Sequence, residues 1–302
     1  MCHVSARLRA TRHLSRWMGK AMERIQLDRR ALGRCGHAVI DPLQVDSNFL
    51  KRFRPESLAP TIRGDHASRL PYVLNLNDLG VADRDDLFAE VADRDSAGDE
   101  PFFSLLIESS HTPGSVIRHL QRVTIVHSPE RKPYHLRYHD AYTLMQLCWI
   151  LDKEQQKTLM GPSSAWLFPL EHRWWRLHPD ERASATPGLR LRDDQWQQLQ
   201  RVGRINVVLE RQRTLAEHRA AFGKQLDSWF ALAESFGLTD EEDAIAFAMQ
   251  GIAHHPEFHR HRTIARILAQ CVGCPRRYSR TTSGLGDADW QRIDTDLSSP
   301  SV

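Results

Sequence analysis

The stretch FFSLLIESSHTPGSVIRHLQ, residues 102–121, gives the clearest indication of the fold. Its first six residues form a near-continuous apolar run, as expected of a β-strand that is covered on both faces. Thr112 is a good N-cap and Pro113 is a good first helical residue, so the sequence predicts a helix over residues 113–121. A buried strand that leads into a helix in this way indicates an α/β unit.

Further strands and helices are predicted on both sides of this stretch. Apolar runs bounded by turn residues predict strands, and apolar residues at helical spacing predict helices. The predicted strands are residues 37–40, 70–76, 102–107, 123–126, 134–138, 165–168 and 172–177. The predicted helices are residues 81–93, 113–121, 140–150 and 153–160. Together they predict an α/β lobe over residues 35–178, with a mixed sheet flanked by helices.

The C-terminal part of the chain has a different pattern. Residues 179–190 (PDERASATPGLR) contain Pro, Gly and Ser without an apolar period, so we interpret them as a linker between lobes. Residues 191–274 are predicted to form an all-α C-terminal lobe, whose last helix covers about residues 257–271. The polar, Ser-rich tail at residues 275–302 is expected to be mobile.

Residues 1–34 are predicted to contain a basic amphipathic helix, because apolar residues recur at helical spacing through residues 5–32. This segment has a net charge of +7, whereas residues 65–100 have a net charge of −7. The two segments could attract each other or different partners, although such charge runs are more often solvated faces. The whole chain has a net charge of only +3, and this helix has one aromatic residue, Trp17. We therefore expect neither a nucleic-acid partner nor membrane insertion.

The composition is that of a soluble globular protein. The 302 residues are 41% hydrophobic and 26% charged, and no run of 18 apolar residues predicts a membrane-spanning helix. No secretory signal is visible at the N-terminus, so a cytoplasmic location is expected. Five cysteines in a chain of this length favour free thiols over a disulfide framework.

Familiar catalytic motifs are missing from the sequence, which contains no GxxxxGK[ST], GxGxxG with a preceding strand, GxSxG or HExxH pattern. We therefore expect no enzyme activity and no cofactor. The alternative of a zinc-binding enzyme or module stays open, because His255, His259, Cys271 and Cys274 have the residue types and pairwise spacing of zinc ligands. A continuous helix between the two pairs would hold them about 18 Å apart, so zinc binding would require the chain to fold back.

Several aromatic residues are candidate anchors for a protein partner. Trp174 and Trp175 are adjacent in a predicted strand, which places one ring inward and the other outward. The outward ring could contact a partner, since Trp is enriched at interface hot spots, or it could pack on the neighbouring lobe. Trp17, Trp229 and Phe230 are further candidates on predicted helices.

The order of motifs in residues 35–178 resembles a known family. The motif residues are Arg137, Asp140, Gln155, Gly161-Pro162 and Trp166, with His37-Ala-Val-Ile-Asp41 as the opening strand. In this order they resemble the type VI secretion effector adaptor (chaperone) family, catalogued as domain of unknown function 4123. The chain departs from that pattern where Ala141-Tyr142 replaces the usual Pro-Arg, and where His139 occupies a position at which a second aromatic is common. Residues 191–271 resemble its variable C-terminal lobe more loosely.

The resemblance implies a function without catalysis. A member of this family is an adaptor that holds a secreted effector (toxin) protein and helps load it onto the spike protein of a type VI secretion machine. The α/β lobe would be the shared scaffold, and the helical lobe would choose the effector. Effector recognition would use the basic helix at residues 5–32 or the exposed faces of residues 191–260. Arg137 and Asp140 would form a bidentate pair that locks a strand–helix turn.

Overall fold

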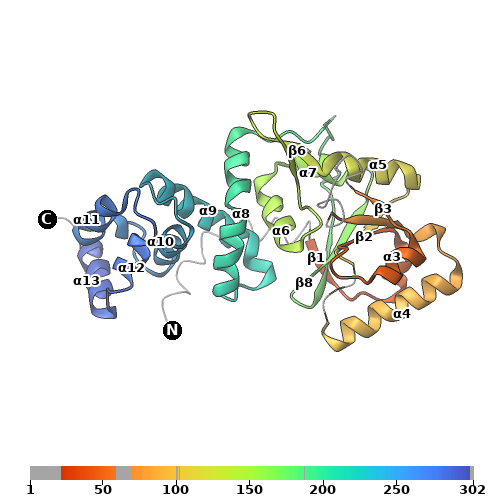
Figure 1. Cartoon of the computed structure of the whole chain (residues 1–302), viewed down its shortest axis with the longest axis horizontal. Helices are drawn as coiled ribbons and strands as arrows, with labels where there is room; N and C mark the ends of the chain where they lie inside the picture. Colours follow the sequence, from red (N-terminus) through yellow and green to blue (C-terminus); the bar gives the residue numbers. More distant parts are fainter. Residues whose placement is uncertain (1–21, 59–69, 100, 102, 187, 300–302) are drawn as a thin grey trace. The chain divides into compact units, whose positions relative to one another are not determined.

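The computed structural model describes residues 22–58, 70–99, 101, 103–186 and 188–299 (Figure 1). The described chain divides after Leu199 into two compact units, and each is considered separately. Trp17 and most of the predicted N-terminal helix lie outside the described residues. The division falls inside a helix, α8 (Asp193–Arg211), whereas the sequence places the linker at residues 179–190. The described residues of that linker contain neither helix nor strand.

The first unit is built on a seven-stranded sheet in the order β1-β9-β8-β5-β2-β4-β3. In chain order the strands are β1 (Met22–Ile25), β2 (Cys35–Ile40), β3 (Glu56–Ser57), β4 (Tyr72–Asn75), β5 (Leu105–Glu108), β8 (Ala165–Leu170) and β9 (Arg173–Leu177). Every pairing between these described strands is antiparallel, where the sequence analysis expects a mixed sheet. The helix between β4 and β5 does join two parallel strands, but β2 lies between them and is antiparallel to both.

Helices cover both faces of the sheet (Figure 1). On one face, α3 (Ser47–Phe53) and α4 (Val81–Ala97) contribute Phe49 and Leu87 to a core that also contains Trp174. On the other face, Trp166 packs against Tyr138, with a distance of 5.4 Å between ring centroids. The helices that follow β5 are α5 (Pro113–Val123), α6 (Ala141–Ile150) and α7 (Lys153–Met160). The predicted α/β class of this lobe is confirmed.

The predicted helix at residues 5–32 is wrong at residues 22–28. Residues Met22–Ile25 form β1, which pairs with β9 from Met22↔Leu177 to Ile25↔Trp174. A short helix, α2 (Arg29–Arg34), begins only after Asp28, whose side chain accepts a hydrogen bond from the Ala31 amide. The spacing of apolar residues fits a helix, but β9 offers an open strand edge, and pairing with it satisfies the backbone of residues 22–25.

The hairpin predicted between residues 123 and 138 is confirmed. Its strands are β6 (Ile125–His127) and β7 (Pro133–His135), which form a separate two-stranded sheet. The helix predicted at residues 113–121 begins at Pro113, as α5 does, and the helix predicted at residues 140–150 corresponds to α6, which begins one residue later at Ala141.

The second unit is helical, as the sequence predicts. Beyond residue 199 it contains the rest of α8, α9 (Arg219–Ser235), α10 (Glu241–Ala253), α11 (Arg262–Cys271), α12 (Arg277–Thr282) and α13 (Asp287–Ser298). Its centre is a cluster of aromatic rings in which Phe247 contacts Phe258 and Tyr278. All three of these residues are completely buried.

The tail at residues 275–302 was expected to be mobile, and this expectation is wrong for its described part. It forms α12 and α13, and Tyr278, Trp290 and Ile293 are buried. Trp290 stacks on His254 with a centroid distance of 4.1 Å and an interplanar angle of 6°. These three buried residues are widely spaced in an otherwise polar segment. The average composition of the segment therefore does not indicate that it packs against the rest of the unit.

Among the described residues, no helix is both long and apolar enough to cross a membrane. The four described cysteines, Cys35, Cys148, Cys271 and Cys274, are free thiols, which agrees with the prediction from the odd cysteine count.

Candidate functional site

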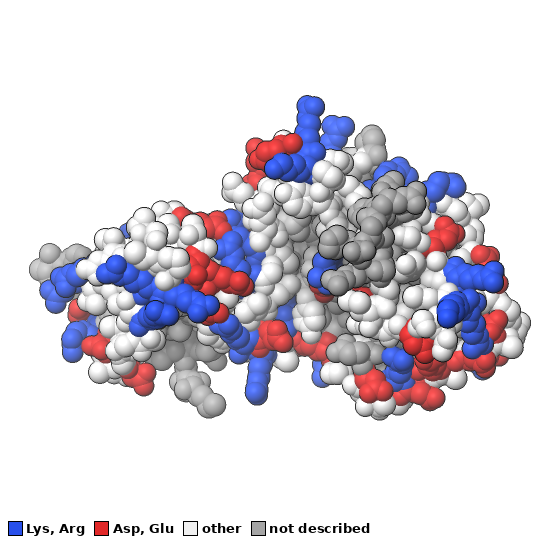
Figure 2. Space-filling view, in the orientation of Figure 1, with Lys and Arg blue, Asp and Glu red and all other residues white. Residues whose placement is uncertain are grey.

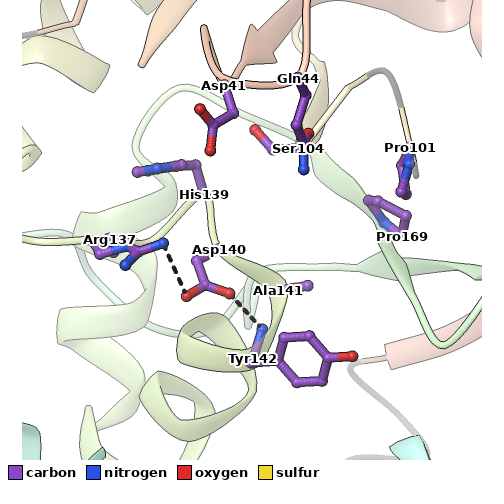
Figure 3. Close-up of a pocket in the computed structure, with 10 residues that line it drawn as sticks. All are labelled: Asp41, Gln44, Pro101, Ser104, Arg137, His139, Asp140, Ala141, Tyr142 and Pro169. Carbon is purple, nitrogen blue, oxygen red and sulfur yellow. Dashed lines mark hydrogen bonds and ion pairs between the residues drawn. The ribbon is translucent and has the colours of Figure 1, made fainter. Parts of the chain in front are cut away.

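A small cavity of about 150 Å³ lies where the sheet meets the start of α6 (Figure 3). It is lined by Asp41 and Gln44 after β2, by Pro101 and Ser104 before β5, by Pro169 in β8, and by Arg137, His139, Asp140, Ala141 and Tyr142. The charged pair of the sequence motif therefore lies at this cavity, which we call the Tyr142 pocket.

Asp140 in the Tyr142 pocket is the N-cap of α6. Its carboxylate accepts hydrogen bonds from the Tyr142 amide and the Thr143 hydroxyl, both at 3.0 Å. Arg137 approaches the same carboxylate with one nitrogen at 3.6 Å, and its side chain is 62% exposed (Figure 3). The expected bidentate pair is therefore not formed. The helix start, and not Arg137, fixes Asp140, because the cap satisfies amides that the helix cannot pair internally.

His139 is the buried group of the Tyr142 pocket. Its side chain is 6% exposed, and its Nδ1 atom has no hydrogen-bond partner among the described residues. Burial, with smaller contributions from the nearby His135 and Arg137, lowers the pKa of His139 to about 3. The imidazole is therefore neutral near pH 7. The His139 ring packs edge-on against Tyr138. His139 occupies the position at which an aromatic residue is common in the family that the sequence resembles.

Gln155 joins α7 to the start of α8. It forms a capping box with Asp152, and its side-chain amide exchanges two hydrogen bonds with Gln195, at 2.9 and 2.6 Å. Gln195 is completely buried and also donates to the Ile150 carbonyl at 2.7 Å. The sequence motif includes Gln155 but not Gln195, because nothing in the local pattern distinguishes Gln195 from the other glutamines of α8.

Gly161 ends α7 in a conformation that favours glycine, with φ of 56° and ψ of −122°. A Cβ atom there would lie 2.2 Å from His119 Nε2, and the same nitrogen lies 3.0 Å from the Leu159 carbonyl oxygen. Burial lowers the pKa of His119, so the ring is neutral and donates this hydrogen bond. The carbonyl of Pro162 accepts a hydrogen bond from the Ser109 hydroxyl at 2.8 Å. This Gly-Pro pair therefore holds α5, α7 and the end of β5 together.

Trp166, the last motif residue, is completely buried in β8. Residues on both neighbouring strands pair with it, Ile107 in β5 and Leu177 in β9. All six motif residues thus lie in the first unit, and five of them serve its internal contacts. Arg137 is the exception, since most of its side chain is exposed.

The predicted partner anchors are mostly buried. Trp174 and Trp175 are 4% and 6% exposed, so the expected outward ring is absent from this strand. The alternation of the strand is correct, but the helical layers cover both faces of the sheet, which buries both rings. Phe230 is completely buried in α9. Trp229 is half-buried over Gly251, where an added Cβ would lie 2.4 Å from the indole.

The proposed zinc ligands do not converge. No group of three or more His, Cys, Asp or Glu side chains in the described part of the chain could hold a metal ion. His259 packs among the rings of Trp229 and Phe247, and His255 Nδ1 accepts a hydrogen bond from the Glu257 amide. Cys271 is buried, whereas Cys274 is partly exposed and contacts Arg277. These neighbours remove the geometric basis of the zinc alternative.

Exposed apolar side chains give a better guide to surfaces than the predicted tryptophans. The large hydrophobic residues that are most exposed are Leu43, Val81, Tyr134, Tyr142, Leu215 and Val272. Tyr142 lines its pocket at 41% exposure, and Leu43, at 74%, lies between the lining residues Asp41 and Gln44. Neither residue is predictable from the sequence pattern, because single apolar residues in loops and first helical turns carry no periodic signal.

Charged segments meet on the surface of the first unit. Asp and Glu side chains gather over α4 (Figure 2), and Arg52 pairs there with Asp83 and Asp86. Arg29 pairs with Asp85, so one residue of the basic segment does reach the acidic one. Because these pairs are exposed, solvent screens them and they contribute little to stability.

A family model described as Domain of unknown function (DUF4123) matches residues 56–158, about a third of the chain. The matched segment runs from β3 into α7, lies within the first unit, and contains Arg137, Asp140 and Gln155. The folded unit extends beyond the match, since β2, which separates β4 from β5, precedes it and β8 and β9 follow it. The chain matches no curated protein and no solved structure.

Proposed function

We propose that the protein is a non-catalytic adaptor that binds a type VI secretion effector and helps load it onto the spike protein. The observation that carries the proposal is the family match over residues 56–158. It coincides with the motif order through which residues 35–178 resemble the effector adaptors. The residues of that motif contribute mainly to the framework of the first unit, as a scaffold shared by adaptors with different cargo would require.

The Tyr142 pocket is the surface that we propose for contact with a protein partner. The exposed Tyr142 lines this pocket, and the exposed Leu43 lies in the chain between the lining residues Asp41 and Gln44. Tyrosine is common among interface hot spots, because its ring buries apolar area while its hydroxyl can still form a hydrogen bond. In this chain Ala141-Tyr142 replaces the Pro-Arg that is usual in the family pattern. Tyr142 is therefore suited to recognise a partner that is specific to this chain.

The test is co-expression of the full chain with the product of the adjacent large open reading frame, followed by size-exclusion chromatography. We expect a stable complex that contains both chains in stoichiometric amounts. Failure of two well-folded proteins to associate would contradict the adaptor function for that pair. The same experiment with the spike protein tests the loading step.

Two variants locate the contact. Tyr142→Ala keeps the backbone amide that Asp140 caps, and it should weaken effector or spike binding at least tenfold if the pocket is the interface. Val81→Ser, at an 80% exposed residue that does not line the pocket, is the matched control and should bind like the natural chain. Equal binding by all three chains would move the interface elsewhere without contradicting the adaptor function.

A further inference from the structure

A second and larger cavity of about 490 Å³ lies beside β6 in the first unit. Its described lining residues come from α5 (His119, Arg122, Val123), from β6 (Ile125, His127), from the end of α7 (Thr158, Gly161, Pro162) and from the segment Ala185, Thr186, Gly188, Leu189 and Arg190. We call it the β6 groove. Figure 1 shows β6 near α5 and α7, the two helices that contribute to its walls.

The charge of the β6 groove has one sign. Arg122 and Arg190 are exposed at its walls, and none of its described lining residues is Asp or Glu. Neither Arg122 nor Arg190 forms an ion pair within the described chain, whereas Arg29 and Arg52 on the same unit are paired with carboxylates of α4. Two unpaired guanidinium groups at one cavity favour a ligand that carries carboxylates, which they can bind through bidentate hydrogen bonds.

The wall that carries Arg190 is fixed in place by α7. Thr186 donates its amide to the Thr158 hydroxyl at 2.7 Å, and the two threonine hydroxyls lie 2.9 Å apart. Gln155 Nε2 donates to the Arg190 carbonyl at 2.7 Å. Because these bonds tether the segment before any ligand arrives, little ordering is required when the groove is occupied.

Among the residues that the structure describes, nothing pairs with the outer edge of β6. Leu136 donates to the Thr124 carbonyl and Ser128 donates to the Lys132 carbonyl, so the even-numbered residues face β7. In an antiparallel ladder the alternate residues, Ile125 and His127, direct their N–H and C=O groups to the other edge. No backbone–backbone hydrogen bond of these two residues is formed within the described chain. Both line the groove, and no residue of β7 does.

We propose that the β6 groove binds an extended, acidic peptide segment of the effector by strand addition to the outer edge of β6. The backbone of the segment would pair with Ile125 and His127, and its carboxylates would bind Arg122 and Arg190. Strand addition is a recurrent way to capture an extended segment, with main-chain bonds supplying affinity and side chains supplying specificity. The basic residues 1–34 of this chain have the wrong charge to occupy the groove. The identity of the ligand as an effector segment rests on the proposed function.

The test uses the full chain and a fluorescein-labelled heptapeptide of alternating Glu and Val residues, with binding measured by fluorescence anisotropy. We expect saturable binding that weakens as salt is added, and a loss of at least tenfold in affinity for the double variant Arg122→Glu/Arg190→Glu. Arg118→Glu is the matched control, because Arg118 is an exposed residue of the same helix that does not line the groove. Circular dichroism establishes that all three chains are folded.

Two further peptides test separately the contribution of side-chain charge and the contribution of backbone pairing. A heptapeptide of alternating Lys and Val should not bind, and an acidic peptide with alternate backbone nitrogens methylated should lose at least tenfold in affinity. Equal binding of the acidic and basic peptides, no effect of the double variant, or no effect of methylation would overturn the inference. Full competition by millimolar inorganic phosphate would also overturn it, because the groove would then be a simple anion site.

The intact effector distinguishes failure of this inference from failure of the proposed function. If the natural chain forms the effector complex and the double variant forms it equally well, the β6 groove is not the binding site and the adaptor function stands. If the acidic peptide binds as expected but no effector associates, the groove is a peptide site and the adaptor function fails.

Discussion

At position 161 a single glycine determines how closely α7 can approach α5. Replacement by alanine would place Cβ 2.2 Å from His119 Nε2 at a backbone φ of 56°. The His119 ring is held by its hydrogen bond to Leu159, so it cannot move aside without losing that bond. We expect Gly161→Ala to reduce the free energy of unfolding of the first unit by about 2–4 kcal/mol, from overpacking and backbone strain together.

Urea unfolding followed by tryptophan fluorescence measures this loss, and Gly33→Ala is its control. Gly33 lies inside α2, and a Cβ there would contact nothing within 4 Å. Alanine should therefore be neutral or stabilise by up to about 1 kcal/mol through its helix propensity. An equal effect of the two substitutions would show that His119 does not restrict position 161.

The buried His139 should make stability depend on pH. Its pKa is lowered by burial to about 3 in the folded chain, whereas an unfolded histidine titrates near 6.5. Below about pH 6.5 the unfolded chain therefore binds a proton that the folded chain does not bind, and stability falls as the pH falls toward 3. The loss is limited to about 1.4 kcal/mol per pH unit for this one group.

Urea unfolding at pH 7 and pH 5 tests the effect of His139. The natural chain should be less stable at pH 5, and His139→Leu should recover about 1–2 kcal/mol of that difference. His111→Leu, at an exposed residue of the same unit, is the matched control, and an equal recovery in both variants would contradict the role of His139. His37, His119 and His135 also have lowered pKa values, so part of the dependence will persist in every variant.

At the scale of elements, the amide pair between Gln155 and Gln195 connects α7 to α8. Gln155→Ala would remove half of the capping box and leave the buried Gln195 amide without two of its hydrogen bonds. We expect a loss of roughly 1–3 kcal/mol in unfolding free energy, since an unpaired buried polar group keeps its desolvation cost. A double-mutant cycle with Gln195→Ala should give a coupling of about 1 kcal/mol or more.

Gln197→Ala supplies the control for this cycle, because Gln197 is exposed on the same helix. Its effect should lie within about 0.5 kcal/mol and should add independently to that of Gln155→Ala. Simple additivity of the Gln155 and Gln195 substitutions would contradict an energetic link between the two helices.

At the scale of the whole molecule, the division between the two units falls inside α8. The residues of α8 before the division are part of the first unit, where Gln195 donates to the Ile150 carbonyl and Trp196 contacts the Tyr134 ring at 4.7 Å. A chain that ends at residue 190, in the predicted linker, would lack both contacts. We expect it to unfold at a lower urea concentration than a chain that ends at residue 211 and keeps the complete helix.

Circular dichroism and urea unfolding of the two shortened chains measure this difference. The replacement Trp196→Ala in the longer chain should account for part of it, because a buried aromatic side chain typically contributes about 3–5 kcal/mol. Equal midpoints for the two shortened chains would place the end of the first unit before residue 190.

Elements with a strong local signal were predicted well. The apolar run before Thr112-Pro113 marks β5, and the helices predicted at residues 140–150 and 153–160 correspond to α6 and α7. The residues singled out by the motif are clustered in the first unit. The prediction failed where a local pattern fits two structures, as at residues 22–25, or where few anchors hold a polar segment, as at Trp290.

Local chemistry therefore determines most helix and strand starts in this chain, because caps, turns and apolar periodicity act between residues close in sequence. Contacts between distant segments determine the rest. The order of the sheet, the burial of both Trp174 and Trp175, the Gln155–Gln195 pair and the open edge of β6 all depend on which segments become neighbours. The sequence carries no local mark of them, because the energy that selects them is gained only when the chain is folded.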